Sequence, residues 1–212
     1  MNEVEKLGAI KHMGDIAATN IAGSMATMFG VEVEMAISSV NLIAVDSIPR
    51  LIGVADDEIV VGSFIYFEGF MSGSALCILT TQSAYEVAGI LLEGMEEESV
   101  SDGTFTGMQQ SALTEFTNII ASSFIDIWAN TLNAEVTQHP PAFARDFMAS
   151  IIDESLIDAS KAGDFAFMFD SLLSVTGSDI SLEVLVLPEM DSLQMVFDNI
   201  TPRTIDNLQS QL

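Results

Sequence analysis

Basic residues are scarce in this chain. Its 212 residues include 6 lysines and arginines against 31 aspartates and glutamates, which gives a formal net charge of −25. Nucleic acid is bound mainly through basic side chains on the phosphate backbone, so the composition argues against that function class. It also disfavours attachment to an anionic membrane surface. Because concentrated salt screens the self-repulsion of an acidic surface, the composition predicts a protein from a high-salt cytoplasm.

Cysteine and long apolar runs are scarce as well. Cys77 is the only cysteine, so an internal disulfide is excluded, and its apolar surroundings predict a buried small side chain. No apolar run approaches the roughly 20 residues of a membrane-spanning helix, so we expect no membrane insertion. The first thirteen residues lack the apolar core of a signal peptide, which predicts a cytoplasmic protein.

Apolar residues make up 49% of the chain, enough for a sizeable core. Their spacing predicts two long helices, from about Val4 to Phe29 with Gly30 as its stop, and from about Gln109 to Leu132. We expect a mixed α/β (α+β) fold in which a largely antiparallel sheet packs against these two helices. The other predicted elements are strands at 31–35, 39–45, 58–67, 73–79, 134–137, 165–175 and 180–187, a turn or short helix near Pro49, and helices at 81–94, 144–159 and 190–199.

The order of predicted elements repeats along the chain. The two related halves cover about 1–95 and 104–199, joined by an acidic linker at 96–103, and we expect one pseudo-two-fold domain rather than a solenoid. A shift of 103 residues supports this interpretation, because it places Ile16 on Ile119, Ala18 on Ala121, Ala26 on Ala129, Glu32 on Glu135 and Val33 on Val136.

The second long helix carries a polar ridge formed by Ser111, Glu115 and Asn118. Steps of four and seven residues return to one side of an α-helix, within an arc of about 60°. A hydroxyl, a carboxylate and a carboxamide therefore project together, and Pro141 follows Asn118 after twenty-two other residues. Such residues on a solvated helix face are common, so the ridge alone is not specific. The opposite side is apolar and predicts a core face: Leu113, Phe116, Ile120, Phe124, Ile127 and Trp128.

The first half keeps the helix but not this ridge. The shift of 103 residues maps Ser111, Glu115, Asn118 and Pro141 onto Gly8, His12, Asp15 and Ser38, none of which is retained in kind. His12 and Asp15 also share one side of their helix, but two ligands without a third do not make a convincing metal site, and we predict none. The sequence thus indicates one equipped site and one degenerate site.

The spacing Ser111, Glu115, Asn118 and Pro141 resembles the signature of the CheC/CheX/FliY phosphatases of chemotaxis. The internal duplication with an acidic linker is similar to CheC in particular, and the resemblance covers about 1–199. Together with the acidic composition, it points to a CheC-like protein from a halophilic archaeon.

The resemblance implies that the protein removes the aspartyl phosphate of a CheY-type response regulator. Asn118 would orient the attacking water, as a glutamine does in GTPases, and Glu115 would pair with a lysine of the regulator. Ser111 and Pro141 would support the site. The protein would need no cofactor of its own, since the Mg²⁺ is expected in the regulator's site.

Two other functions stay open at this stage. The protein could be mainly a non-catalytic adaptor that binds CheY or the receptor deamidase CheD, because the family is known to pair with CheD. A flagellar-switch component like FliY is a weaker alternative, since the chain shows no appended motor-binding domain.

Overall fold

The computed structural model describes residues 2–30, 32–94, 104–175 without 156–164, and 178–204. The predicted acidic linker at 96–103 lies outside these residues. The strands are β1 (Val33–Ala44), β2 (Ile59–Gly69), β3 (Gly73–Thr80), β4 (Val136–Gln138), β5 (Ala142–Phe147), β6 (Phe165–Val175) and β7 (Ser178–Pro188). The helices are α1 (Glu3–Phe29), α2 (Ile48–Ile52), α3 (Thr81–Leu91), α4 (Gly107–Leu132), α5 (Met148–Ser155) and α6 (Met190–Asn199), with a 3₁₀ turn at Val45–Ser47.

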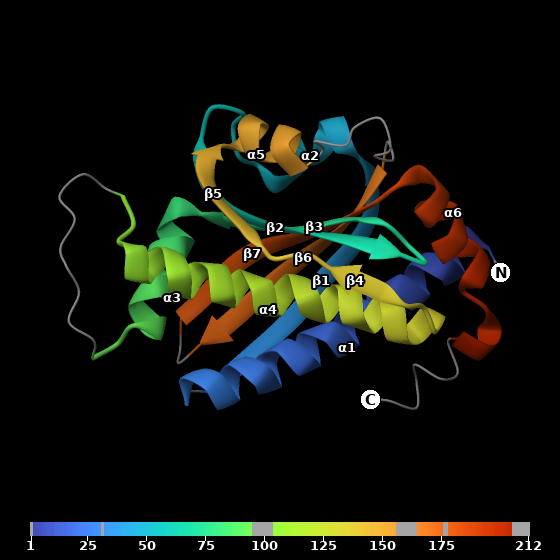
Figure 1. Ribbon diagram of the computed structural model, residues 1–212, viewed down its shortest axis with the longest axis horizontal. Coiled ribbons are helices and arrows are strands. Elements are labelled where there is room, and N and C mark those ends of the chain that lie inside the picture. The colour runs from blue at the N-terminus through green and yellow to red at the C-terminus, as the bar shows by residue number, and fades with distance from the viewer. Residues whose placement is uncertain (1, 31, 95–103, 156–164, 176–177, 205–212) are drawn as a thin grey trace.

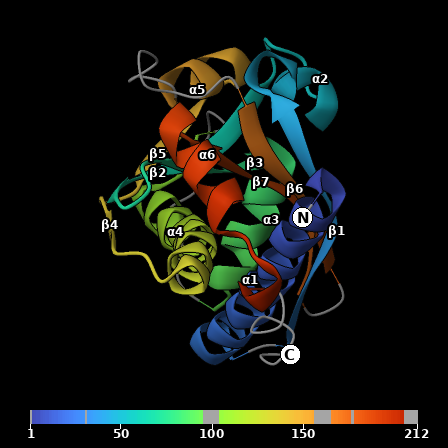
Figure 2. The same ribbon diagram turned by 90° about the vertical axis from the view of Figure 1, so that its right-hand side faces the viewer.

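Within this part of the chain, the strands form one seven-stranded antiparallel sheet. Its order is β1-β6-β7-β3-β2-β4, and β5 also pairs with β2. The sheet lies between two helical layers, with α1 and α4 on one face and α2 and α5 on the other (Figures 1 and 2). The predicted fold class, a largely antiparallel sheet packed by two long helices, is confirmed.

The two long helices run antiparallel along the same face of the sheet (Figure 1) and pack against each other. The predicted core residues of α4 are buried, and Phe124 and Trp128 meet Phe169 and Phe167 of β6 edge to face, with ring centroids 4.8 and 5.1 Å apart. Gly14 brings α1 close to the same strand, because a Cβ there would lie 3.0 Å from the Phe169 ring. Edge-to-face pairs of this kind contribute about 0.5–1.5 kcal/mol each beyond the apolar area that they bury.

Both long helices have defined ends. Each begins with a capping box, formed by Asn2 and Glu5 in α1 and by Thr106 and Gln109 in α4. Each ends in a left-handed residue, Gly30 with φ 67° and Asn133 with φ 51°. The predicted stop at Gly30 is confirmed, and these caps satisfy backbone groups that a helix leaves unpaired at its ends.

The two halves exchange strands. β1 of the first half pairs with β6 of the second, while β4 and β5 of the second half pair with β2 of the first. The hairpins β2–β3 and β6–β7 then meet along β3 and β7 at the centre of the sheet. The strand order therefore maps onto itself when the halves are swapped, a topology that supports the predicted internal duplication.

Two of the secondary-structure predictions, one for a pair of strands and one for a helix, are wrong. The separate strands predicted at 31–35 and 39–45 form the single strand β1, whose register against β6 shifts between Ile37 and Ser39. The helix predicted at 144–159 begins only at Met148, because the preceding residues form β5 along the edge of β2. Pairing with the sheet prevails there over the local helical pattern. The rest of that prediction, from 156 on, lies outside the described residues.

Cys77 is fully buried on β3, as predicted. Burial, reinforced by the negative charge of Glu183, raises the pKa of its thiol to about 12, so the thiol stays protonated at neutral pH. Among the described helices, none combines the length and the apolar character that crossing a bilayer requires.

The face of the sheet that is turned toward α2 and α5 holds a pair of carboxyl groups on adjacent strands. Asp170 of β6 is the cross-strand partner of Glu183 of β7, and the Ser39 hydroxyl of β1 donates to Asp170. Burial, then repulsion by Asp170 and a hydrogen bond with it, raise the pKa of Glu183 to about 8 from its ordinary value of 4.5. Glu183 therefore holds a proton at neutral pH.

This pair predicts a pH-dependent stability. The folded state binds the Glu183 proton more tightly than the unfolded state, so its contribution is intact below about pH 4.5 and is lost as pH rises toward 8. We expect Glu183→Gln to flatten this decline, and to be more stable than the wild type at pH 8, in thermal unfolding at constant KCl. Glu34→Gln, an exposed change on β1, controls for the loss of one charge. Parallel wild-type and Glu183→Gln curves would contradict the assignment.

Candidate functional site

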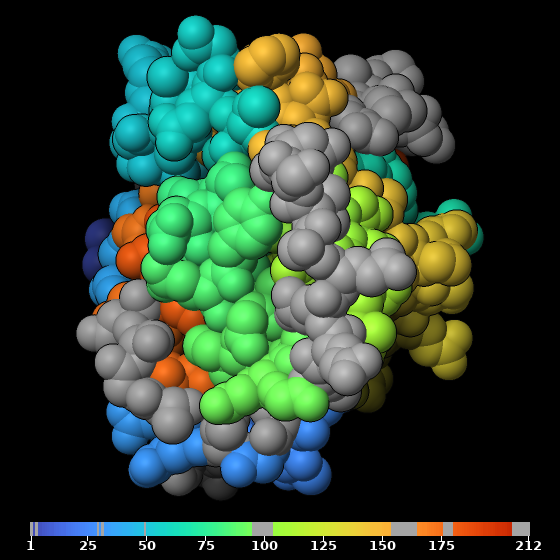
Figure 3. Space-filling view, turned by 90° about the vertical axis from the view of Figure 1, so that its left-hand side faces the viewer, coloured from blue at the N-terminus to red at the C-terminus, as the bar shows by residue number. Residues whose placement is uncertain are grey.

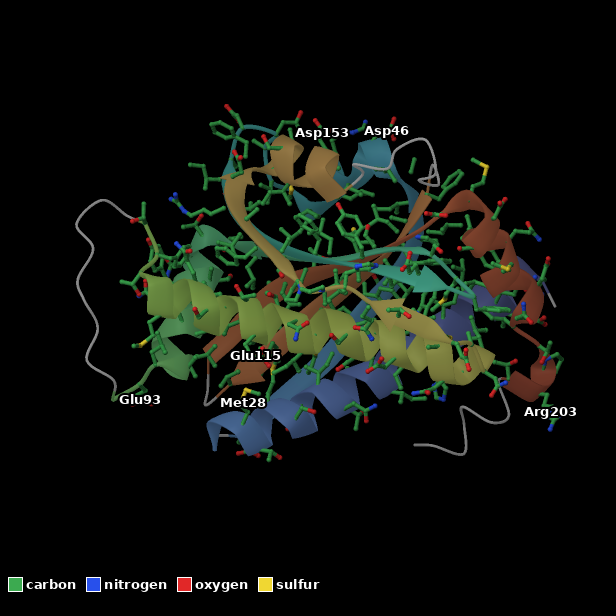
Figure 4. All side chains as sticks on the ribbon, in the orientation of Figure 1. Met28, Asp46, Glu93, Glu115, Asp153 and Arg203 are labelled. Carbon is green, nitrogen blue, oxygen red and sulfur yellow. The ribbon has the colours of Figure 1, made fainter. Side chains whose placement is uncertain are left out.

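The predicted polar ridge lies on the outer side of α4. Ser111 and Glu115 are exposed and Asn118 is half-buried, whereas Leu113, Phe116 and Thr117 between them are buried. Figure 4 shows Glu115 on the side of α4 that is turned away from the sheet. The structure therefore brings the three ridge residues together on one surface of a helix whose other side is held in the core.

Glu115 is an unpaired carboxylate. Among the described residues it has no hydrogen-bond or ion-pair partner. In a chain with 6 basic residues, an exposed acid rarely finds an internal cation. Glu115 is thus available to a cationic group of another molecule, and such a charge-assisted bond would be stronger than a neutral one.

Asn118 and Ser111 are both held by neighbours on the helix. The Ser122 hydroxyl donates to Asn118 Oδ1 at 3.3 Å, and the Ser111 hydroxyl donates to the Gly107 carbonyl at 2.9 Å. The Ser111 proton is therefore used within the helix, which leaves its oxygen as an acceptor. Ser122 limits the rotation of the Asn118 carboxamide and so favours one orientation of a group bound to it.

The ridge of α1 differs in its chemistry. Gly8 contributes no side chain, and the Lys11 ammonium binds both oxygens of Asp15 at 2.9 Å. His12 has a buried Nε2 without a hydrogen-bond partner in the described part of the chain. Asp15 is thus neutralised within its own helix, while Glu115 is not. No metal-binding group of three or more His, Cys, Asp or Glu side chains occurs among the residues that the structure describes.

Pro141 lies on the edge of the sheet rather than on α4. It is half-buried in the segment between β4 and β5, where both strands pair with β2 but the ladder is interrupted. A proline has no N–H to donate to such a ladder, which explains a break at this point. Ser38, the corresponding residue of the first half, lies at the register shift of β1. The pairing of the equivalent strand is therefore interrupted at the same point in both halves. In the second half, α4 packs against the sheet edge that Pro141 shapes.

Two polar residues that extend the ridge were missed by sequence reasoning. Ser122 and Asp126 follow Asn118 at steps of four and eight residues. The Gln138 amide of β4 donates to Asp126 Oδ1 at 2.6 Å. Burial raises the pKa of Asp126, and the Gln138 hydrogen bond partly opposes that rise. The same i, i+4 spacing that identified the ridge would have identified Ser122.

The stretch that carries the site also relates the chain to known proteins. Residues 108–145, which include Ser111, Glu115, Asn118 and Pro141, match the model of the CheC-like family. Together with the relatives below, this match confirms the predicted resemblance to CheC-like proteins.

Two relatives match nearly the whole chain. CheC of Bacillus subtilis, named a CheY-P phosphatase, is 25% identical over 195 residues, which cover 91% of this chain and 92% of the relative. CheC1 of Halobacterium salinarum, whose name assigns the same activity provisionally, is 26% identical over 200 residues, which cover 94% and 98%. The similarity to a Halobacterium protein agrees with the halophilic character predicted from the acidic composition.

A solved structure supports the fold. FliY of Thermotoga maritima is similar with a TM-score of 0.69 at 13% identity, over 94% of this chain and 96% of that one. At this identity the similarity concerns the arrangement of helices and strands, which agrees with the antiparallel sheet and paired long helices described above.

The capping box of α4 is expected to stabilise the first turn of the helix on which the ridge lies, and this can be tested. The Thr106 hydroxyl accepts from Gln109 N–H at 3.1 Å, and the Gln109 side chain accepts from Thr106 N–H at 3.0 Å. We expect Thr106→Ala to lower the free energy of unfolding by about 1 kcal/mol, because an N–H of the first turn loses its partner. Denaturant unfolding in fixed KCl measures this. Thr106→Ser keeps the hydroxyl and should retain most of the stability; equal losses in both variants would speak against the cap.

Proposed function

We propose that this protein is a phosphatase that hydrolyses the aspartyl phosphate of a CheY-type response regulator, and that it uses the ridge of α4 alone. The observation that carries the proposal is the unpaired Glu115, one turn from Asn118, on an exposed helix face within the stretch similar to the CheC-like family. The CheY-P phosphatase names of both relatives support the substrate.

The reaction needs few groups from this chain. A water oxygen attacks phosphorus, the bond from phosphorus to the aspartyl oxygen breaks, and the regulator's carboxylate leaves as inorganic phosphate forms. The water proton passes to phosphate or solvent. The Mg²⁺ that stabilises the developing charge belongs to the regulator, so the phosphatase supplies a correctly placed water.

Asn118 suits this role because a carboxamide both donates and accepts hydrogen bonds and does not itself attack phosphorus. Glu115 pairs with a lysine of the regulator and fixes the docked position, since its carboxylate has no cationic partner among the described residues. Ser111 presents an acceptor beside them, and Pro141 shapes the sheet edge on which α4 rests. The α1 ridge cannot replace them: Asp15 would bring a negative charge toward the phosphoryl group and is already bound to Lys11.

The two halves then share an origin but not a function. We infer that they are copies of one unit, of which the second, about 104–199, keeps the active residues and the first, about 1–95, has lost them. Such a protein acts where its regulator is found, in the cytoplasm.

Asn118→Ala tests the catalytic assignment. We expect the rate of phosphate release from phosphorylated regulator, followed in concentrated KCl, to fall about a hundredfold toward the regulator's own rate, because the attacking water loses its positioning group. Asp15→Ala is the matched control on α1 and should leave the rate within about twofold.

An unchanged rate in Asn118→Ala would remove catalysis from this ridge. Tight binding of the regulator, or of CheD, without faster phosphate release by the wild-type protein would instead select the adaptor function.

Ser122→Ala tests whether the orientation of the Asn118 amide matters. We expect kcat to fall about three- to tenfold with KM unchanged, because the amide remains but rotates more freely. Ser123→Ala is a close control, since its hydroxyl donates to the Ile119 carbonyl at 2.7 Å and does not contact Asn118. Equal rates in the two serine variants would show that the Ser122 contact has no catalytic role.

A further inference from the structure

The C-terminal half of α1 carries no charged side chain. From Ile16 to Phe29 the chain has neither an acidic nor a basic residue, and from Gly107 to Ile125 of α4 it has Glu115 alone. A longer uncharged run, from Gly69 to Tyr85, is centred on the buried strand β3, whereas the runs in α1 and α4 include exposed helix positions. An exposed helix surface without charge contrasts with the strongly acidic composition of the chain as a whole.

The two stretches lie side by side. α1 and α4 pack against each other in antiparallel directions, so the end of α1 and the beginning of α4 lie at the same end of the helix pair, where the two helices diverge (Figure 1). Met25 of α1 and Phe116 of α4 line the same buried hollow. Figure 4 shows Met28 and Glu115 near the same end of the helix pair, and Figure 3 shows that end of the molecule, with α3 in green above the C-terminal end of α1 in blue.

The uncharged side of α1 has the composition of a protein interface. Asn20, Gly23, Ser24 and Thr27 are exposed, Met28 is 51% exposed, and these five residues line a shallow hollow on the helix surface. Another methionine, Met108 at the start of α4, is 49% exposed. The centres of interfaces are depleted of acidic residues and lysine and enriched in methionine, because a buried charge without a partner is costly and methionine adapts its shape to a partner.

We propose that this surface of α1, formed by Asn20, Gly23, Ser24, Thr27 and Met28, is a docking surface for the same phosphorylated response regulator. The inference rests on the function proposed above. A specific interface buries about 800 Å² on each partner, which exceeds what a single helix ridge offers. Packed helices lie about 8–10 Å apart, so a regulator whose phosphoryl group reaches Asn118 also covers the neighbouring part of α1.

The regulator also explains the absence of charge. Its aspartyl phosphate and metal-binding carboxylates bring acidic groups to the interface, and an acidic side chain on α1 would be buried there without a partner. The first half, which has lost the catalytic residues, thus contributes to the reaction by binding the substrate protein.

Two threonines of α1 allow a matched test. Thr27 and Thr19 are both exposed, and each hydroxyl donates to the carbonyl four residues earlier, at 2.9 and 3.0 Å. They are about 12 Å apart along the helix, and only Thr27 lines the hollow. We expect Thr27→Glu to weaken binding of beryllofluoride-loaded regulator at least tenfold and to raise KM, with kcat unchanged. Thr19→Glu should stay within about twofold, and Met28→Ala should weaken binding about threefold.

The outcomes separate the two proposals. If Thr27→Glu binds as well as Thr19→Glu while Asn118→Ala abolishes phosphate release, the docking surface is refuted and the phosphatase function stands. If Asn118→Ala has no effect but Thr27→Glu still weakens binding, the surface stands and the catalytic proposal fails. Should Thr27→Glu unfold, Ser24→Asp tests the same surface. A change of oligomeric state in Thr27→Glu without regulator would assign the surface to a second copy of the chain and overturn the proposal.

Discussion

The exchange of strands between the two halves is the constraint on which the rest of the structure depends. β1 completes the sheet beside β6, and β4 with β5 completes it beside β2, so neither half can form its share of the sheet alone. The exchange also places α1 and α4 next to each other on one face, because each helix precedes the strand that is exchanged. The ridge of Ser111, Glu115 and Asn118 therefore stands beside a helix from the other half, and the two ridges are free to diverge while the packing beneath them is retained.

The buried sides of the two helices explain why divergence is confined to their outer surfaces. Gly14 and Phe124 both meet Phe169, so a larger side chain at Gly14 would displace a ring that α4 also contacts. The outer residues carry no such constraint. Asp15 is paired with Lys11 on one helix, while Glu115 is unpaired on the other. The two ridges also differ at the equivalent positions themselves, since His12 stands where α4 has Glu115 and Asp15 stands where it has Asn118.

Periodicity predicted most of this architecture, because long amphipathic helices and alternating strands leave clear patterns. It failed at Ala142–Phe147, a short edge strand whose conformation depends on pairing with β2. The internal repeat would have predicted this strand, because the shift of 103 residues maps the strand Val33–Ala44 onto residues 136–147, the span from β4 to β5. Helical spacing identified Ser111, Glu115 and Asn118, but the contact of Ser122 with Asn118 depends on rotamers that no spacing predicts.

Concentrated salt changes which interactions can recognise a partner. At an ionic strength near 1 M the screening length is about 3 Å, so long-range attraction between charged surfaces is largely lost. A pair formed by Glu115 and a regulator lysine keeps its strength only where direct contact excludes ions and water. Close packing against an uncharged surface provides that exclusion, and Met28 and Met108 are suited to it. In the proposed complex, the uncharged C-terminal half of α1 would supply the water-excluding contact in which Glu115, the one charge between Gly107 and Ile125 of α4, acts.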